Sequence, residues 1–304
     1  MESLLKSQVD IVIVTYNSAL VIEALLDSIP DAIDDVRSSV IVVDNGSIDS
    51  TREILLKRSD CKVIVSHNGG YAAGINRGVR EGSNSDAILV LNPDAKLHKG
   101  SIRHMLNALA VPGTGIVAPR IVSESGETQL SLCRDFTLLR ALGLTRFKSS
   151  AFSEYVQEPE AYEKPHAVEW ACGAALMMSR PCFDILDGWD ESFFLYSEET
   201  DLALRARDLG ISVRYEPRAV VMHIGGGSGR SGKTYAMLAI NRVRLYGRRH
   251  NRIATWCFFW LMVAKELSWA ARGHGERKFS ASALLRPSLR PVELKSSSSL
   301  LPHW

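Results

Sequence analysis

Short apolar, β-branched runs alternate with helix-like segments over the first 120 residues of this chain. The runs have the length and composition of buried parallel strands, and they cover residues 9–15, 40–43, 63–65, 87–91 and 115–121. The segments between them predict helices over residues 19–29, 49–56, 73–81 and 98–110, the first of which stops at Pro30. This alternation with short loops predicts an α/β fold built on a doubly wound, mostly parallel sheet.

The rest of the chain is less regular. Residues 122–165 read as an insertion with a short helix near 138–142, and strand-like segments follow at 168–179, 213–215 and 219–224 around a helix at 197–209. A basic, aromatic helical region then extends to about residue 272. We therefore expect an α/β domain over 1–235, a helical extension over 236–290 and a disordered tail over 291–304.

Composition excludes several classes of protein. Hydrophobic residues make up 46% of the chain and charged residues 23%, values that are ordinary for a folded soluble protein. The five cysteines have no CxxC spacing, which argues against a zinc site or a disulfide framework and favours a reducing cytosol. We find no signal peptide and no apolar run of the ~18 residues that a spanning helix needs. A cytoplasmic protein with no nucleic-acid partner is expected.

Polar residues follow several of the predicted strands, at the sheet edge where open α/β folds bind ligands. Thr15-Tyr16-Asn17 closes the first strand, and Asp44 closes the second. Each group also has a purely structural interpretation, because Asn17 or Ser18 could cap the next helix and Asn45-Gly46 is a turn signal. The small residues from Asn68 to Gly74 follow the third strand and would let a ligand approach the backbone.

The segment Asn92-Pro93-Asp94 is the most informative of these strand ends. It places a carboxylate after the apolar run 87–91, while His223 ends a later strand and Glu198-Glu199-Thr200-Asp201 opens a helix. A lone strand-end histidine is usually structural, and an acidic helix start is often only a favourable charge on the helix dipole. Together the three groups predict a site for a divalent metal and a phosphate group, with a spare carboxylate as general base.

An aromatic-rich stretch, residues 189–196, precedes the acidic helix start. Aromatic side chains exclude water and offer flat faces to sugar rings, so this stretch favours a carbohydrate substrate over a plain surface loop. Residues 227–234 provide a competing motif, because they match the phosphate-binding pattern GxxxxGK[ST]. However, only basic and helical sequence follows, with no later strand to supply an acidic metal partner. This context argues against a P-loop.

Taken in order, these motifs resemble the family 2 inverting glycosyltransferases, most closely the rhamnosyltransferase-like branch. The resemblance spans roughly residues 9–228. Its motifs are Val-Thr-Tyr-Asn (14–17), Val-Asp-Asn-Gly-Ser (43–47), Asn-Gly-Gly-Tyr-Ala-Ala-Gly-Ile-Asn (68–76), Asn-Pro-Asp (92–94), Gly-Trp-Asp-Glu-Ser-Phe-Phe (188–194), Glu-Glu-x-Asp-Leu (198–202) and His-x-x-Gly (223–226). The resemblance implies a GT-A fold, a nucleoside-diphosphate sugar donor of the dTDP or UDP type, and Mn²⁺ or Mg²⁺.

The resemblance also implies a role for each motif residue. The nucleotide and donor pocket would be formed by Thr15, Tyr16, Asn17, Asp44, Asn68, Gly70, Asn76 and Asn92. Asp94 and His223 would bind the metal, with Asn92 in place of the first aspartate of the family's DxD motif. Glu199 matches the catalytic base, although it replaces an aspartate and leaves Glu198 as the alternative. The acceptor would contact Trp170, Trp189, Asp190 and Glu191.

The function expected from the sequence is therefore inverting transfer of rhamnose or a similar sugar to a cell-envelope or lipid-linked glycan. The basic, Trp-rich tail would lie on the inner face of the plasma membrane or, equally, pack on the domain or in a homodimer. Two alternatives stay open: a P-loop nucleotide hydrolase or kinase that uses Gly227–Thr234 with Lys233, and a non-catalytic protein that binds sugar nucleotides.

Overall fold

The computed structural model describes residues 7–143, 149–225, 231–294 and 300. Within these residues nine strands form one sheet in the order β3-β2-β1-β4-β10-β6-β11-β5, with β8 paired to β11. The strands are β1 (Gln8–Thr15), β2 (Arg37–Asp44), β3 (Lys62–Val65), β4 (Ala87–Leu91), β5 (Ala95–Leu97), β6 (Thr114–Val122), β8 (His166–Val168), β10 (Ala175–Ser179) and β11 (Ser212–His223). β10 runs antiparallel between β4 and β6, and the sheet is mostly parallel as predicted.

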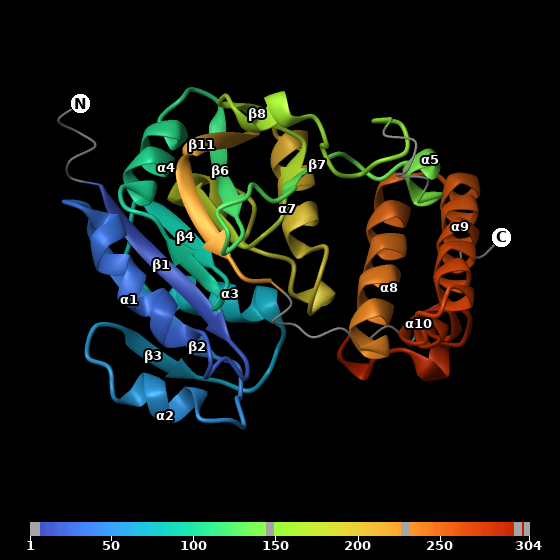
Figure 1. Cartoon of the computed structure of the whole chain (residues 1–304), viewed down its shortest axis with the longest axis horizontal. Helices are drawn as coiled ribbons and strands as arrows, with labels where there is room; N and C mark the ends of the chain where they lie inside the picture. The colour runs from blue at the N-terminus through green and yellow to red at the C-terminus, as the bar shows by residue number, and fades with distance from the viewer. Residues whose placement is uncertain (1–6, 144–148, 226–230, 295–299, 301–304) are drawn as a thin grey trace.

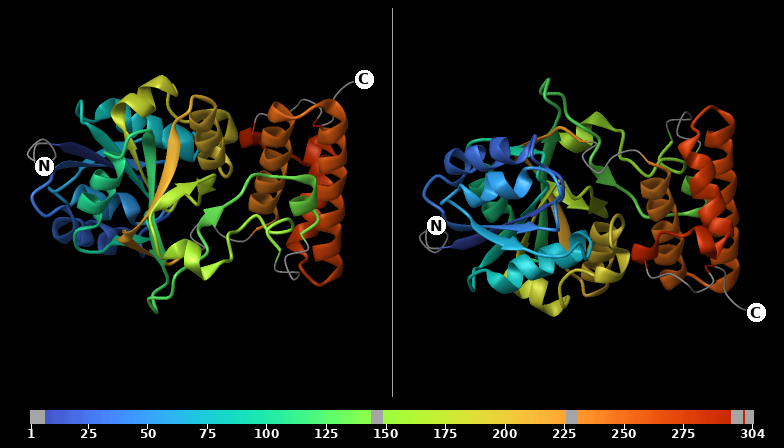
Figure 2. Two further views of the ribbon diagram at one scale, coloured as in Figure 1. Left: turned by 90° about the horizontal axis from the view of Figure 1, so that it is seen from above. Right: turned by 90° about the horizontal axis from the view of Figure 1, so that it is seen from below.

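Helices cover both faces of this sheet (Figure 2). They are α1 (Ile22–Ile33), α2 (Thr51–Leu56), α3 (Tyr71–Glu81), α4 (Ser101–Leu109), α5 (Leu138–Ala141), α6 (Arg180–Ile185), α7 (Glu198–Asp208), α8 (Gly232–Arg249), α9 (Arg252–Ala271) and α10 (Glu276–Leu285). Alternate side chains of β1 point to opposite faces of the sheet. Ile11 and Ile13 belong to the core under α1 and α4, whereas Val12 and Val14 belong to the core under α3, α6 and α7. This period of two is why a continuous apolar strand can be buried on both faces.

Several sequence predictions differ from the structure. Pro30 lies inside α1, which continues to Ile33 instead of stopping at the proline. The strands predicted at 213–215 and 219–224 are one strand, β11, with a register shift between Glu216 and Val220. The segment 168–179 contains two strands besides the end of β8, namely β9 (Trp170–Ala171), which pairs with β7 (Leu132–Cys133), and β10. The short helix predicted near 138–142 is confirmed as α5.

The C-terminal helices α8, α9 and α10 pack on one another beside the sheet domain, and α8 is the helix nearest to it (Figure 1). Their shared core includes Ile240, Phe258, Phe259 and Leu284. The predicted disordered tail was 291–304, but its first residues are ordered. Val292–Leu294 forms a 3-10 helix, and Leu294 is buried. Most of the remaining tail lies outside the described residues. No helix in the described part of the chain is both long and apolar enough to cross a membrane.

Candidate active site

The ends of β1 and β2 lie side by side, and Thr15 and Asp44 are register partners. The Thr15 hydroxyl donates to Asp44 Oδ1 at 3.2 Å, and neither side chain is exposed. The hydroxyl and the main-chain N–H of Ser47 donate to the same carboxylate. Asp44 therefore fixes the loop after β2 from beneath, and the sheet register brings the two predicted nucleotide residues together.

Tyr16 and Asn17 occupy the loop immediately above. The Tyr16 side chain is 51% exposed, so its ring is open to a flat ligand. Asn17 has a φ of 52°, and its Oδ1 accepts from the Ile48 N–H at 2.9 Å. The alternative in which Asn17 or Ser18 caps the next helix is wrong, because the N-cap residue of α1 is Val21 and no side chain caps this helix. Asn17 instead joins the two strand-end loops.

The loop before α3 contains the predicted donor residues Asn68 and Gly70. Asn68 Oδ1 accepts from the Gly70 N–H at 3.1 Å, and Gly70 has a φ of +97°. A Cβ atom on Gly70 would lie 2.5 Å from the Phe194 carbonyl oxygen, so only glycine fits here. Asn76 lies further along the helix, where its amide exchanges hydrogen bonds of 2.8 and 2.9 Å with the Trp189 main chain. The structure thus separates Asn76 from the other two residues and fastens it to the Trp189 loop.

Asp94 and His223 meet at the carboxyl edge of the sheet. β5 and β11 are antiparallel with His223 opposite Ala95, which brings His223 Nε2 to 3.2 Å from Asp94 Oδ1. The other carboxylate oxygen accepts from the Gly225 N–H at 3.1 Å. Burial alone would raise the pKa of Asp94, but the hydrogen bonds from His223 and the backbone outweigh it and lower the pKa. Asp94 is therefore an anion beside an imidazole.

Tyr71 connects this pair to the acidic helix start. Its hydroxyl donates to Asn92 Oδ1 at 2.7 Å, and the Asn92 amide lies 3.4 Å from His223 Nε2. Burial, followed by the negative charges of Glu198, Glu199 and Asp94, raises the pKa of Tyr71 well above its usual value. Tyr71 is therefore near enough to all three carboxylates for their charges to affect its pKa, and its hydroxyl is bonded to Asn92. Tyr71 is not among the site residues predicted from the sequence, although it lies inside the motif at 68–76.

The two glutamates at the start of α7 differ in exposure. Glu198 is 4% exposed, and its Oε2 has no hydrogen-bond partner among the described residues. Glu199 is partly exposed and lies against Gly173, where a Cβ atom would be 3.5 Å from the Glu199 Cβ. Burial raises the pKa of both carboxyls. A raised pKa and partial access suit Glu199 to accept a proton near neutral pH.

A divalent metal fits this edge only with help from a substrate. The described residues contain no group of three His, Cys, Asp or Glu side chains that could hold a metal ion. Asp94 and His223 supply one carboxylate oxygen and one imidazole nitrogen, a donor pair that suits Mn²⁺ better than Mg²⁺. Such metals often take one or two protein ligands and complete their shell with water and substrate phosphates. The donor set therefore fits a metal that is shared with a diphosphate.

The predicted acceptor residues are less accessible than the sequence suggested. Trp170 and Trp189 are 5% and 2% exposed, so both form buried walls rather than open faces. Trp189 packs edge-on against Tyr71 with ring centroids 6.4 Å apart. Asp190 pairs with Arg248 at 2.7 Å, and Glu191 accepts from Asn76 at 3.0 Å. Asn76, Trp189, Asp190 and Glu191 all line one polar surface cavity of about 480 Å³.

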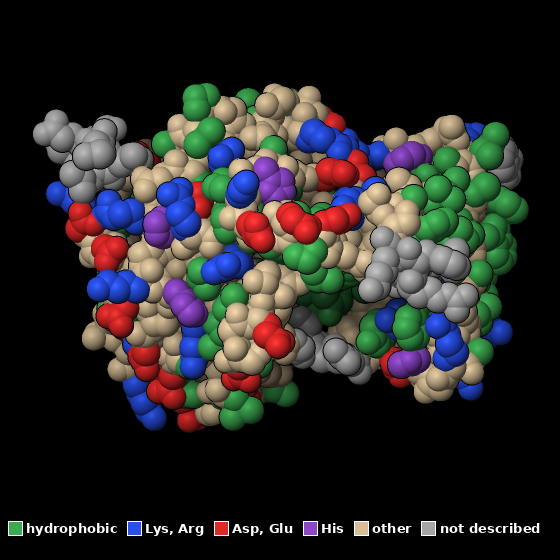
Figure 3. Space-filling model, turned by 45° about the horizontal axis from the view of Figure 1, so that its top comes forward, with side chains coloured by type: hydrophobic (Ala, Val, Ile, Leu, Met, Phe, Trp, Pro, Cys, Tyr) green, Lys and Arg blue, Asp and Glu red, His purple; other side chains and the backbone are tan. Residues whose placement is uncertain are grey.

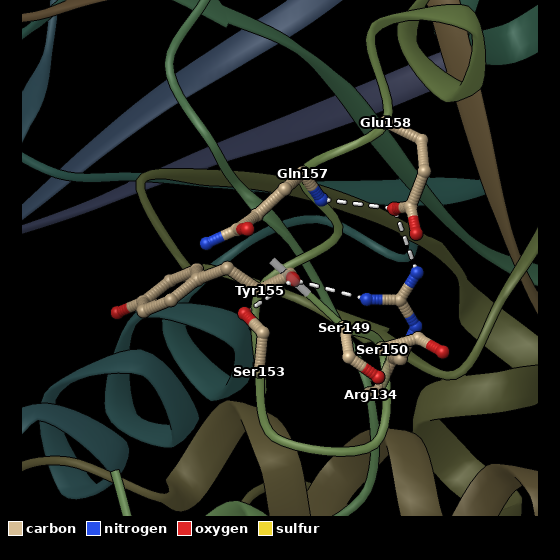
Figure 4. Close-up of a pocket in the computed structure, with 7 residues that line it drawn as sticks. All are labelled: Arg134, Ser149, Ser150, Ser153, Tyr155, Gln157 and Glu158. Atoms are coloured by element: carbon tan, nitrogen blue, oxygen red, sulfur yellow. Dashed lines mark hydrogen bonds and ion pairs between the residues drawn. The ribbon is translucent and has the colours of Figure 1, made fainter. Parts of the chain in front are cut away.

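A second cavity, of about 220 Å³, lies in the insertion (Figure 4). Its lining residues are Arg134, Ser149, Ser150, Ser153, Tyr155, Gln157 and Glu158. The Arg134 guanidinium is held by Glu158 at 2.7 Å and by the Tyr155 carbonyl at 3.0 Å. None of the predicted site residues lines this cavity, and its cation is already paired.

The P-loop motif falls partly outside the described residues, which omit 227–230. The part that is described begins α8, where the Ser231 side chain accepts from the Thr234 N–H in a capping box. The Lys233 ammonium pairs with Glu293 of the C-terminal segment. Lys233 is therefore occupied by a structural ion pair in this structure.

Comparison with known proteins agrees with this geometry. Residues 10–159 match the family model described as Glycosyl transferase family 2. The N-acetylglucosaminyl-diphospho-decaprenol L-rhamnosyltransferase of Mycobacterium tuberculosis is 30% identical over 232 residues, which cover 70% of this chain and 75% of that protein. The low-salt glycan biosynthesis hexosyltransferase Agl10 of Haloferax volcanii is 31% identical over 208 residues, 67% of this chain, and the match spans 62% of that relative's length.

The fold is also similar to that of a solved enzyme. The crystal structure of GalNAc-T7 with UDP, GalNAc and Mn²⁺ superposes with a TM-score of 0.61 over 79% of this chain and 47% of that chain. The two sequences are 14% identical over the match, so this likeness concerns the fold alone.

Proposed function

Because the chain belongs to glycosyl transferase family 2, we propose that it inverts the anomeric centre of a sugar as it transfers that sugar from a nucleoside diphosphate to a glycan hydroxyl. The observation that carries this proposal is that Tyr71 connects the two groups: its hydroxyl bonds to Asn92 beside His223, and its main-chain N–H donates to the Phe194 carbonyl, four residues before Glu198. A site for a leaving diphosphate and a site for a general base are thus joined through one residue. Inverting displacement needs both sites, because the nucleophile attacks opposite the leaving group.

The donor would bind along the carboxyl edge of the sheet. Thr15 and Asp44 would hold the nucleotide from below, and the exposed ring of Tyr16 offers a surface for the base. Asn17, Asn68, Gly70 and Asn92 line the same edge, from the loops after β1, β3 and β4. Asn76 would act indirectly, through the Trp189 loop that it fastens. A dTDP or UDP sugar carrying rhamnose or a similar hexose is the proposed donor.

Asp94 and His223 would hold Mn²⁺ or Mg²⁺ together with the diphosphate. When bound, such a metal neutralises charge on the leaving group. Asp94 itself contributes a fixed negative charge, because its hydrogen bonds lower its pKa. Asn92 orients His223 from one side while Tyr71 orients Asn92.

Glu199 would remove the proton from the acceptor hydroxyl. Its partial exposure lets an acceptor approach, whereas the carboxyl of Glu198 is enclosed. Trp170 and Trp189 would support the acceptor side from behind, and Asp190 and Glu191 would line its outer cavity. The base takes the proton as the hydroxyl oxygen attacks the anomeric carbon and the nucleoside diphosphate departs.

A lipid-linked acceptor at a membrane surface completes the proposal, and the outer face of α9 supports it. The exposed large side chains on this helix are Ile253, Trp256, Trp260 and Leu267, which recur at helical spacing along about 20 Å of the 20-residue helix. Arg252 and Arg272 stand exposed at its two ends, and its single acid, Glu266, is 1% exposed and paired with Arg277. Figure 3 shows apolar side chains gathered over this side of the C-terminal helices. An apolar, Trp-containing face with flanking arginines complements an anionic bilayer.

The decisive experiment is a screen of nucleotide sugars with purified protein, with Mn²⁺ or with a chelator. We expect one donor to be consumed only with the metal, and the product to have the opposite anomeric configuration by NMR. Lys233→Ala serves as the control for the P-loop alternative and should retain transfer. Retention of anomeric configuration, or nucleotide hydrolysis that disappears in Lys233→Ala, would contradict the proposal.

A further inference from the structure

The segment that leads into the two glutamates has an unusual backbone. Phe194, Tyr196 and Ser197 have φ values of 60°, 69° and 74°. Three of four successive residues therefore have a positive φ, which residues other than glycine rarely adopt. Ser197 then becomes the N-terminal flanking residue of α7, with no side-chain cap. The conformation of this segment, residues 193–197, therefore sets the direction in which Glu198 and Glu199 leave the backbone.

Strained backbone persists only where surrounding contacts overdetermine it. On one side the contact comes from α3, where the Tyr71 N–H donates to the Phe194 carbonyl at 2.7 Å and Gly70 approaches the same residue too closely for any side chain. This contact links the segment to Tyr71, whose hydroxyl bonds to Asn92. On the other side the contacts come from the C-terminal helices.

Asn241 of α8 is the centre of those contacts. Its side chain is fully buried, and Nδ2 lies 2.7, 2.9 and 3.0 Å from the main-chain carbonyl oxygens of Phe193, Leu195 and Tyr196. Its Oδ1 accepts from Arg244 at 3.1 Å, which fixes the orientation of the amide. A single side chain thus gathers three carbonyls of the strained segment.

Two arginines of α8 make further contacts with residues near the segment. Arg244 donates to the Ser192 carbonyl at 2.9 Å, and Arg248 bridges Asp190 and Asp201 at 2.7 and 3.4 Å. Both guanidinium groups also lie over the Phe193 ring, at 5.4 and 4.7 Å from its centroid. The arginines bond residues that flank the segment on its two sides, whereas Asn241 bonds the segment itself.

We propose that Asn241 is a positioning residue that sets the direction of Glu199, and of its neighbour Glu198, through the main chain of residues 193–197, which makes α8 part of the active site. Loss of the amide would free three carbonyls and let the segment relax toward ordinary backbone angles. Glu199 would then turn away from the acceptor while the nucleotide end of the site, at Thr15 and Asp44, would not change. The expected effect on catalysis rests on the proposed glycosyl transfer, but the claim that Asn241 holds residues 193–197 in place does not.

The test compares Asn241→Ala with Leu284→Ala. Leu284 is 1% exposed in the shared core of the C-terminal helices and lies on α10 rather than α8, so its truncation removes packing while the Asn241 amide and its hydrogen bonds stay in place. Amide hydrogen exchange is measured at Tyr71 and Asp201, whose N–H groups donate to Phe194 and Ser197. We expect Asn241→Ala to accelerate exchange at both amides at least tenfold relative to Leu284→Ala.

Kinetics provide the second measurement. Asn241→Ala should lower kcat by about 10–100-fold and change the donor KM less than threefold, as expected when positioning of a base is lost but the nucleotide site is intact. If Asn241→Ala does not fold, Asn241→Ser removes the same amide with a smaller change and is measured instead.

Equal exchange and equal kcat in the Asn241 variant and in Leu284→Ala would overturn the inference. So would an Asn241 variant whose donor KM rises while kcat stays constant. If no transfer activity exists in the native protein, the proposed function fails, and the exchange experiment still decides whether Asn241 holds the segment.

Discussion

The phenol of Tyr71 donates a 2.7 Å hydrogen bond to the amide oxygen of Asn92. This bond joins the first residue of α3 to the end of β4, and through Asn92 it reaches His223. Tyr71 thereby relates the donor side of the site to the side that contains Glu198 and Glu199.

Tyr71→Phe should weaken binding of a nucleoside diphosphate with Mn²⁺ by about 2–10-fold, because a neutral hydrogen bond contributes about 0.5–1.5 kcal/mol and Asn92 would lose its orienting partner. Titration calorimetry measures the effect. Tyr162→Phe is the matched control, since the hydroxyl of buried Tyr162 is also hydrogen-bonded, donating to the Val156 carbonyl and accepting from the Leu132 N–H, but lies in the insertion. Equal affinities in both variants would show that Tyr71 does not orient Asn92.

Glu199→Gln should lower turnover by about 10²–10⁴-fold with little change in donor binding, which is the usual contribution of a general base. The amide keeps the shape of the side chain but cannot accept the proton. Glu198→Gln is the matched control and should retain most activity, because the enclosed Glu198 carboxyl is the less accessible of the pair. An inactive Glu198→Gln variant beside a fully active Glu199→Gln variant would move the base by one residue.

Glu198→Gln should also stabilise the folded protein at neutral pH. Burial raises the pKa of Glu198 above its ordinary value of 4.5, so the folded state holds this proton more tightly than the unfolded state. The protonated carboxyl therefore contributes its full stability at pH values below its pKa in the unfolded state. This contribution is lost as the pH rises through its pKa in the folded state. Denaturant unfolding should therefore show Glu198→Gln more stable by about 1–3 kcal/mol at pH 8, the penalty for a buried group without a partner, and equal to the native protein near pH 4.

Glu216→Gln is a control for which we expect the opposite change in stability at pH 8. Burial would raise the pKa of Glu216, but hydrogen bonds from Arg218 outweigh it and lower the pKa. The ionised carboxylate therefore contributes stability at pH values above its pKa in the unfolded state, and this contribution is lost as the pH falls through its pKa in the folded state. Glu216→Gln should accordingly be less stable than the native protein at pH 8. If both variants respond to pH in the same direction, the assignment of Glu198 as a neutral buried acid is wrong.

Asp94→Ala should weaken Mn²⁺-dependent binding of a nucleoside diphosphate by about 10–100-fold, because a charged interaction of about 1.5–3 kcal/mol is removed. Calorimetric titrations with Mn²⁺ and with a chelator measure the difference. Asp60→Ala removes an exposed carboxylate that pairs only with Arg58 in the described contacts and should behave like the native protein. Identical affinity of the native protein with and without Mn²⁺ would remove the metal from the mechanism.

Substitution of both Trp256 and Trp260 by Gln should reduce cosedimentation with anionic vesicles at least tenfold, since two interfacial aromatic side chains are lost from the α9 face. Ile185→Gln is the control, because Ile185 is 62% exposed on α6 of the sheet domain, outside this face. Unchanged vesicle binding would contradict the membrane proposal. A shift from dimer to monomer in the double variant, without an effect on vesicles, would identify the face as a contact between two copies of the chain.

Much of the sheet and part of the site were predictable from local pattern. The apolar runs at 9–15 and 87–91 are buried strands because their length and β-branched composition leave few other solutions. The carboxyl ends of parallel strands meet at one edge, so the proximity of Thr15 and Asp44 followed from the order of the motifs. The motifs themselves also predicted the family, which the comparisons confirm.

What the sequence could not provide depends on contacts between distant segments. Tyr71 reaches Asn92, 21 residues away, and Asn241 reaches the Phe193 carbonyl across 48 residues. No periodicity encodes such pairs. The burial of Trp170 and Trp189 was likewise missed, because an aromatic side chain looks the same in sequence whether it lines a cleft or supports its wall.

The sequence by itself determined the alternation of strands and helices, the family, and the set of polar residues at the strand ends. The tertiary structure alone decided that Glu198 is enclosed while Glu199 is accessible, and that α8 closes over the segment before them. The physical reason is that strand and helix periodicity is local to the chain. Burial, pKa shifts and backbone strain arise only when side chains from separate elements exclude water from one another.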